Sequence, residues 1–276
     1  MTPSPFRVTL WGVRGSLPVS GAIAGEFGGN TICVEMRCGD EVLIFDAGSG
    51  LAAAGAALAA EGRERVTLML THSHYDHMIG LPFFAPLWNA AARVDLWSGH
   101  MAGKMSTAQI MDDFLRPPFF PVGRDRFKAQ VNLHDFTPGD VIEPAPGLVV
   151  RTAALNHPGG AVGFRVEWAG RVAVLVTDTE HVTDARDRAV LALSSGADLL
   201  LYDAAYEDDE FSKHNGFGHS TWQEAIRVAQ AADVARLGLI HHAPWRGPAD
   251  LARIERAAAD RFSGAFCGRD GMVIDL

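Results

Sequence analysis

The sequence predicts an α/β protein in which two β-sheets pack together beneath outer helices. Apolar runs of strand length recur in both halves of the chain, and segments with helical spacing of apolar residues lie among them. No linker, charge run or low-complexity tract divides the 276 residues. We therefore expect one domain spanning residues 1–276, a length that a single α/β domain reaches.

The first third of the chain is typical of strands separated by glycine turns. Strands are expected over residues 7–11, 31–36, 41–45, 66–71 and 93–97. An alanine-rich helix over 51–60 ends at Gly62, and a second helix is expected to begin at Ile79.

Residues 99–147 have a less regular pattern, with proline and aromatic residues gathered over 114–121. Exposed apolar segments usually mark contacts. The segment is therefore expected to be a lid or a dimer-contact insertion. A loop packed on the core is an equally good interpretation.

The second half repeats the pattern of the first. Strands are expected near 148–155, 162–168, 171–177, 198–202 and 236–240, and helices near 184–194, 221–232 and 249–261. The helix over 221–232 has a start signal, because Ser220 can cap it and Gln223 completes a capping box. Its apolar residues, among them Trp222, Ala225 and Ile226, fall on one face.

The composition, 48% hydrophobic and 21% charged, is typical of a globular protein, and no run of about 18 apolar residues predicts a membrane span. The opening residues lack the basic region and apolar core of a secretory signal. The three cysteines, Cys33, Cys38 and Cys267, favour reduced thiols, so we expect a cytoplasmic location. A Cys33–Cys38 disulfide is the alternative. The formal charge of −9 argues against broad binding to nucleic acid backbones.

The segment 72–77, HSHYDH, carries most of the chemical information. It follows the apolar run 66–70 and gathers three imidazoles and a carboxylate at the end of an expected strand. Imidazoles and carboxylates in one short loop are ligands for divalent metal. A polar loop with surface histidines is the alternative, which suits one histidine better than a cluster.

Three later apolar runs end in the same residue types, at His157, Asp178 and the pair His241-His242. Loops at strand ends converge on one edge of a sheet and build sites there. The candidate ligands are His72, His74, Asp76, His77, His157, Asp178 and His241. Seven ligands suit two ions, and the two oxygens of Asp178 suit a bridge. Taken singly, His157 could be a surface residue and Asp178 a turn residue, and His242 competes with His241.

The H-x-H-x-D-H segment, followed in order by His157, Asp178 and His241, resembles the metallo-β-lactamase superfamily of metal-dependent hydrolases. The resemblance implies a four-layer αββα sandwich with two divalent ions, foremost zinc, with manganese or iron as alternatives. It also implies how the ions are held. His72, His74 and His157 would hold one ion, Asp76, His77 and His241 the other, and Asp178 would bridge them.

The segments 198–206 and 218–221 resemble the phosphodiesterase branch of that superfamily, which includes ribonuclease Z and cyclic phosphodiesterases. The resemblance implies that Asp203 and His219 are catalytic and handle the leaving-group proton. A metal-bound hydroxide would attack phosphorus, and the departing alkoxide needs an acid. A histidine that merely flanks the helix start is the alternative for His219.

The chain lacks the basic, Gly/Pro-rich arm with which ribonuclease Z enzymes grip tRNA. The expected substrate is therefore a small-molecule phosphodiester such as a cyclic nucleotide, with no tRNA and no membrane as partners and a homodimer left open. Arg14 is expected either to bind a phosphate at the site mouth or to form a surface salt bridge.

Two other functions compete with phosphodiester hydrolysis. A thioester or lactam hydrolase of the same superfamily would use the metal ligands and leave Asp203 and His219 idle. A non-catalytic, metal-bearing accessory protein would need no turnover, although all seven ligand positions are filled.

Overall fold

The computed structural model describes residues 6–182 and 187–276, and its strands there form two seven-stranded sheets. The first sheet has the order β14 (Met272–Asp275), β1 (Phe6–Gly12), β2 (Cys33–Cys38), β3 (Glu41–Phe45), β4 (Arg65–Leu70), β5 (Arg93–Ser98) and β6 (Gln130–Asp135). The second has the order β13 (Ala265–Cys267), β12 (Leu237–Ile240), β11 (Leu199–Asp203), β10 (Arg171–Val176), β9 (Ala161–Trp168), β8 (Leu148–Leu155) and β7 (Val141–Ala145).

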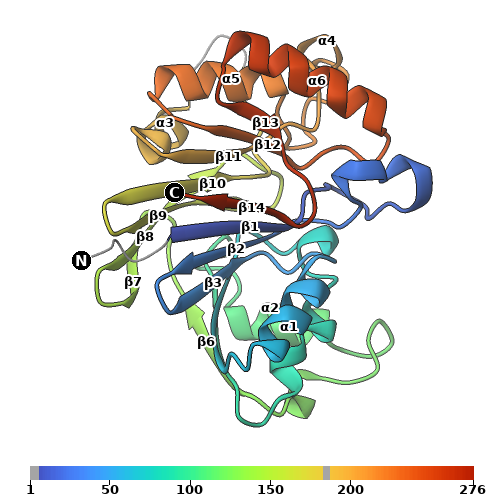
Figure 1. The fold of residues 1–276 in the computed structure, drawn as a ribbon. Coiled ribbons are helices and arrows are strands. Elements are labelled where there is room, and N and C mark those ends of the chain that lie inside the picture. The colour runs from blue at the N-terminus through green and yellow to red at the C-terminus, as the bar shows by residue number, and fades with distance from the viewer. Residues whose placement is uncertain (1–5, 183–186) are drawn as a thin grey trace.

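Helices cover the outer face of each sheet, as Figure 1 shows. On the first sheet lie α1 (Leu51–Ala60) and α2 (Thr107–Phe114), and on the second lie α3 (Arg188–Ser194), α5 (Trp222–Ala231) and α6 (Pro248–Arg261), with the short α4 (Asp208–Phe211) nearby. The four layers follow the order α, β, β, α.

Successive side chains of the apolar strands point to opposite faces of each sheet, and they build three buried layers. In β3, Leu43 and Phe45 face the second sheet, whereas Ile44 packs with the α1 side. In β11, Leu201 lies in the layer between the sheets and Leu200 packs under the outer helices. Because side chains on a strand alternate between faces, a strand buried on both sides is apolar throughout. This is why the sequence shows continuous apolar runs.

Both sheets contain a parallel half, and this positions the candidate ligands. Strands β3 to β6 are parallel in the first sheet, and β10 to β13 are parallel in the second. The carboxyl ends of parallel strands meet at one edge of a sheet, where the following loops build a site. The loops after β4, β10, β11 and β12 carry most of the candidate residues.

The helix expected from Ile79 is absent, and this prediction was wrong. Two short 3₁₀ turns, η4 (Leu81–Phe83) and η5 (Ala85–Trp88), take its place. A helix running on from Ile79 would be broken at Pro86, which lacks the backbone N–H that should donate to residue 82, and each proline instead lies in the first turn of its own 3₁₀ segment.

The expected cap of α5 is displaced by one residue. Thr221, not Ser220, is the N-cap, and its hydroxyl accepts from the backbone N–H of Glu224 at 3.0 Å. The Ser220 hydroxyl instead lies 2.7 Å from Nδ1 of His181. The apolar face of the helix forms as expected, with Trp222 and Ile226 buried.

The segment 99–147 contains α2, β6 and β7, so much of it belongs to the layers. Phe119, in the loop between α2 and β6, is 76% exposed, and a lid or contact role for this loop stays a prediction. The helix expected over 184–194 appears as α3, and residues 184–186 lie outside the described residues. Among the described helices, none combines the length and apolar character needed to cross a membrane.

Candidate metal centre

The loop after β4 brings several candidate ligands together because it turns tightly. A 3₁₀ turn over Tyr75–His77 follows an extended His74. His72 and His77 are buried, at 1% and 0% exposure, while His74 is exposed. Burial of neutral imidazoles at a strand end needs polar partners.

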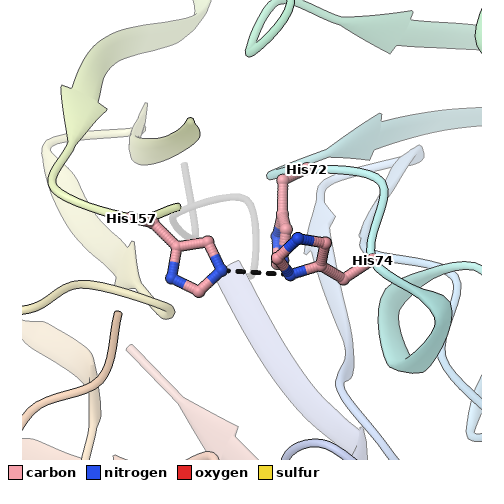
Figure 2. Close-up of side chains that lie close together, drawn as sticks. All are labelled: His72, His74 and His157. Atoms are coloured by element: carbon pink, nitrogen blue, oxygen red, sulfur yellow. Dashed lines mark hydrogen bonds between the residues drawn. The ribbon is translucent and has the colours of Figure 1, made fainter. Parts of the chain in front are cut away.

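One group of ligand atoms consists of three imidazoles. A ring nitrogen of each of His72, His74 and His157 lies within 4.8 Å of the others. Nε2 of His157 lies 3.1 Å from Nδ1 of His74, and Figure 2 shows the three rings turned toward one another. His157 comes from the second sheet, after β8, so this group spans both sheets.

The second group consists of Asp76, His77 and His241. Oδ2 of Asp76 lies 3.3 Å from Nε2 of His77 and 3.4 Å from Nε2 of His241. His241 follows β12 directly, so this group also joins the two sheets. The two groups contain the residues of the two ligand sets that the resemblance implied, and metal binding by these residues stays a prediction.

Asp178 lies between the two groups. Its Oδ1 is 3.8 Å from Nε2 of His72 and 3.9 Å from Nε2 of His157. Its carboxylate is also 3.2 Å from Nε2 of His77 and 3.2 Å from Nε2 of His241. A single buried carboxylate within 4 Å of both groups has the position that a bridging ligand requires.

The residues present fit metal ions. Nε2 of His72, Nε2 of His77 and both ring nitrogens of His241 are buried, yet none makes a hydrogen bond within the described residues. Buried polar atoms rarely lack a partner unless an ion or water supplies one. A donor set of imidazole nitrogens and carboxylate oxygens is typical of zinc and also suits iron or manganese.

Burial and neighbouring carboxylates shift the pKa values of the buried histidines in the site. Burial lowers the pKa of His72 well below its usual value. For His241, burial acts in the same direction, but the carboxylates of Asp178, Asp76 and Asp203 together outweigh it and raise the pKa to about 9. The pKa of His77 is likewise raised well above its usual value, against burial, by Asp178, Asp46 and Asp76. A metal ion must displace these protons, so binding is coupled to proton release.

Asp46 supports the ligands and was missed in the sequence. Its carboxylate accepts from the backbone N–H of Thr71 at 2.7 Å and from the Thr71 hydroxyl at 2.8 Å. Its Oδ2 lies 2.8 Å from Nδ1 of His77, which orients the other ring nitrogen toward Asp178. The available signal was its place directly after the strand 41–45, where the other site residues also follow strands.

His241 and His242 have separate roles, as the sequence favoured. His242 is turned away, with Nε2 3.2 Å from the carbonyl oxygen of Gly268, and burial lowers its pKa to about 3. His241 packs on the backbone of Gly15. A Cβ at Gly15 would lie 2.1 Å from Nδ1 of His241, so only glycine fits there.

The expected catalytic pair is brought together beside the ligands. Nδ1 of His219 lies 3.0 Å from Oδ2 of Asp203 and 3.6 Å from Oδ1 of Asp178. The same Asp203 carboxylate accepts from the backbone N–H of Asp178 at 3.1 Å. The pair is therefore coupled directly to the residue between the two groups.

Both interpretations of Arg14 were wrong, because its side chain is fully buried. Its guanidinium donates to the carbonyl oxygens of Gly28 at 2.9 Å, Arg246 at 2.7 Å and Ile23 at 3.0 Å. Arg14 therefore braces the loops beside the site from within. It is not available to bind a substrate phosphate or to form a surface salt bridge.

Comparison with known proteins adds a family and a fold. The sequence profile described as "Beta-lactamase superfamily domain" matches residues 42–242. The ribonuclease Z of Natronomonas pharaonis is 25% identical over 98% of this chain and 98% of its own. The metallo-beta-lactamase fold protein YhfI from Bacillus subtilis is 20% identical, with a TM-score of 0.75, over 99% of this chain and 100% of its own. The short form of human tRNase Z is 22% identical, with a TM-score of 0.65, over 97% of this chain and 98% of its own.

These similarities confirm the αββα sandwich and correct the expected partners. The expectation of a small substrate without tRNA is contradicted, because a relative that matches nearly the whole chain is a ribonuclease Z and a structural neighbour is a tRNase Z. The argument from charge failed for a physical reason. A net charge of −9 describes the whole chain, whereas contact with RNA depends on the potential near the site.

Proposed function

The chain belongs to the beta-lactamase superfamily, and from this premise we propose that it is a metal-dependent phosphodiesterase whose first substrate to test is tRNA-like RNA. The observation that carries the proposal is the Asp203–His219 pair, 3.0 Å apart, beside the candidate ligands. Cleavage of a phosphodiester expels an alkoxide, which needs a proton donor. The ribonuclease Z relatives support the choice of RNA.

The candidate ligands divide the work of holding two ions. His72, His74 and His157 are proposed to hold one ion, Asp76, His77 and His241 the second, and Asp178 both. Zinc is the proposed metal. Two divalent ions bound there would polarise the phosphoryl oxygens and activate a water molecule.

The protein's own groups then manage the proton on the leaving side. Oδ2 of Asp203 lies 3.0 Å from Nδ1 of His219, a contact that fixes the orientation and tautomer of the ring. That leaves Nε2 of His219 as the atom that can protonate the departing oxygen. Asp203 also accepts a hydrogen bond from the backbone N–H of Asp178, so His219 is held at a fixed position relative to the proposed ligands.

The test compares leaving groups in one metal-loaded preparation, with metal content measured on the same sample. His219→Ala should slow cleavage of a precursor tRNA, which expels an alkoxide, by about 10²–10⁴-fold. It should slow cleavage of bis(p-nitrophenyl) phosphate much less, because p-nitrophenolate leaves without a proton. Cyclic nucleotides in the same panel test the narrower expectation from the sequence.

A matched control is available at a second His–Asp pair. Nε2 of His134 lies 2.9 Å from Oδ1 of Asp95, away from the candidate ligands on β6 and β5. His134→Ala should leave both rates unchanged. Equal slowing of the two substrates by His219→Ala would show a structural role instead. Failure of the zinc- or manganese-loaded protein to cleave any phosphodiester would rule out the proposed activity.

A further inference from the structure

Four aromatic side chains gather next to His219, and three of them have nearly parallel rings. The ring centroids of Tyr206 and His214 are 4.2 Å apart at an interplanar angle of 8°. Trp245 lies 6.3 Å from Tyr206 at 19° and 6.1 Å from His214 at 23°. Phe217 lies 5.6 Å from His214 but is tilted by 57°, so its ring borders the parallel set without belonging to it. We call Tyr206, His214, Phe217 and Trp245 the aromatic platform.

The platform is continuous with the proposed proton donor. The Tyr206 ring centroid lies 6.0 Å from that of His219, at an angle of 72°. The Tyr206 backbone is tied to the same segment, since its N–H donates to the carbonyl oxygen of Ser220 at 3.0 Å. His219 in turn stacks on His241 at 4.6 Å. A ligand on the platform would therefore lie beside the leaving-group side of the site.

Two members of the platform are exposed although their loops are firmly held. Trp245 is 52% exposed and Phe217 is 60% exposed. The neighbouring Arg246 is buried and pairs with Glu207 and Glu210. Glu180 accepts from the backbone N–H of Gly218 at 2.9 Å. Large exposed aromatic side chains on braced loops add little to the core, and such groups usually serve binding.

We propose that the platform stacks the nucleobase that flanks the scissile phosphodiester on the exposed ring of Trp245, with Phe217 packing against the edge of that base. This inference rests on the proposed function and names the part of the substrate that is recognised beyond the phosphate. Planar rings within 23° of one another present a surface suited to another planar ring. Aromatic side chains bind bases in this way with little regard to sequence.

The test measures how much the nucleobase alone contributes to substrate binding. A dinucleoside monophosphate and its analogue that lacks the base of the leaving nucleoside differ only in that nucleobase, and both expel a sugar alkoxide. Wild-type protein should have a lower KM for the base-bearing ester. Trp245→Leu, which keeps apolar bulk but no ring, should narrow the ratio of the two KM values by about tenfold, whereas Trp245→Phe should largely preserve it.

A matched control uses another tryptophan. Trp168 ends β9, at the hairpin away from the candidate ligands, so Trp168→Leu should leave the ratio as in wild type. A second arm uses short RNAs with or without a base beside the cleaved bond. It shows whether the platform binds an RNA end as well as a dinucleoside phosphate. An unchanged ratio in folded Trp245→Leu, in both arms, would overturn the inference.

Failure of the inference is distinguishable from failure of the proposed function. If no phosphodiester is cleaved, calorimetric titration with adenosine monophosphate and with ribose phosphate still tests the platform. Tighter binding of the nucleotide, lost in Trp245→Leu and kept in Trp245→Phe, would support base stacking independently of turnover. Equal binding of the two ligands would reject it. A different result would assign the platform to a contact between copies of the chain. In that case the wild type self-associates, Trp245→Leu does not, and the two proteins have the same ratio of KM values.

Discussion

Three acidic or imidazole residues at the site hold an unusual backbone conformation. Asp46, Asp178 and His241 have φ values of +64°, +57° and +59°. Each lies in the left-handed region, which residues other than glycine rarely adopt. Each also follows a strand within two residues, so the left-handed turn occurs where the chain leaves the sheet. Such conformations persist where surrounding structure enforces them, and they gather at functional sites.

Replacing Asp46 tests how the ligands are supported while every proposed ligand residue stays in place. Asp46→Ala should weaken zinc binding by about 10–100-fold, because His77 loses the partner that orients its ring. Competition with a chromogenic chelator measures the affinity. Asp198→Ala is the control, since Asp198 also accepts a backbone N–H, from Val172 at 2.8 Å, but at the opposite end of its sheet. Equal zinc affinity in both variants would remove Asp46 from the support of the site.

Two glycines, Gly218 and Gly216, allow the contact between the backbone of Gly218 and the His157 ring to be tested separately from backbone strain. Gly218 and Gly216 have φ values of +85° and +86°, so alanine is similarly strained at both. A Cβ at Gly218 would lie 2.1 Å from Nδ1 of His157, whereas a Cβ at Gly216 meets nothing within 4 Å. Gly218→Ala should therefore lower zinc affinity more than tenfold. Gly216→Ala should change only the unfolding midpoint, and a matching loss of zinc in that variant would contradict the contact argument.

Single residues were predictable from the sequence when their chemistry was clustered along the chain. The segment 72–77 stood out because several ligand types lie close together in sequence. Asp46 and Arg14 carry no such local pattern, since their partners are distant in the chain. Arg14 reaches the carbonyl oxygen of Arg246, which only the folded backbone brings near. In a sequence, an isolated charged residue is expected at the surface. Only the tertiary contacts show that Arg14 is buried and holds three loop carbonyl oxygens.

At the scale of elements, the start of α5 positions the segment that carries His219. The Thr221 hydroxyl caps the helix through Glu224 and also donates to Asp208 at 2.7 Å. Thr221→Ala should destabilise the protein by about 1 kcal/mol, measured by urea unfolding. Thr221→Ser keeps the hydroxyl and should lose much less. Equal destabilisation by the two substitutions would mean that the lost methyl group, and not the cap, matters.

Elements with a strong apolar pattern were predictable from the sequence, whereas the strands β6, β7, β13 and β14 were not expected. A strand buried on both faces leaves a continuous apolar run, which located β3, β4 and β10 to within a residue or so. The start of α5 depends on which of two adjacent hydroxyls is drawn elsewhere, and Ser220 is engaged by His181. The helix expected at Ile79 failed because apolar content was weighed above the two prolines that follow.

At the scale of the whole molecule, the proposed ligands join the two sheets. His72, His74, Asp76 and His77 follow β4 of the first sheet, whereas His157, Asp178 and His241 follow strands of the second. An ion bound to residues from both sheets would restrain their separation. Without an ion, buried nitrogen atoms of His72 and His241 lack hydrogen bonds, which disfavours the folded state.

Metal removal should therefore lower the stability of the entire fold. A ligand at 1,000 times its Kd contributes about 4 kcal/mol, which for a chain of this size corresponds to a shift of Tm on the order of 10 °C. Dialysis against a chelator, followed by differential scanning calorimetry, measures the shift, and added zinc should restore the original Tm. Magnesium is the control, because it prefers oxygen ligands and should restore little. A chelated protein with an unchanged Tm and no residual metal would show that the sheets hold together without ions, and would confine any metal to chemistry alone.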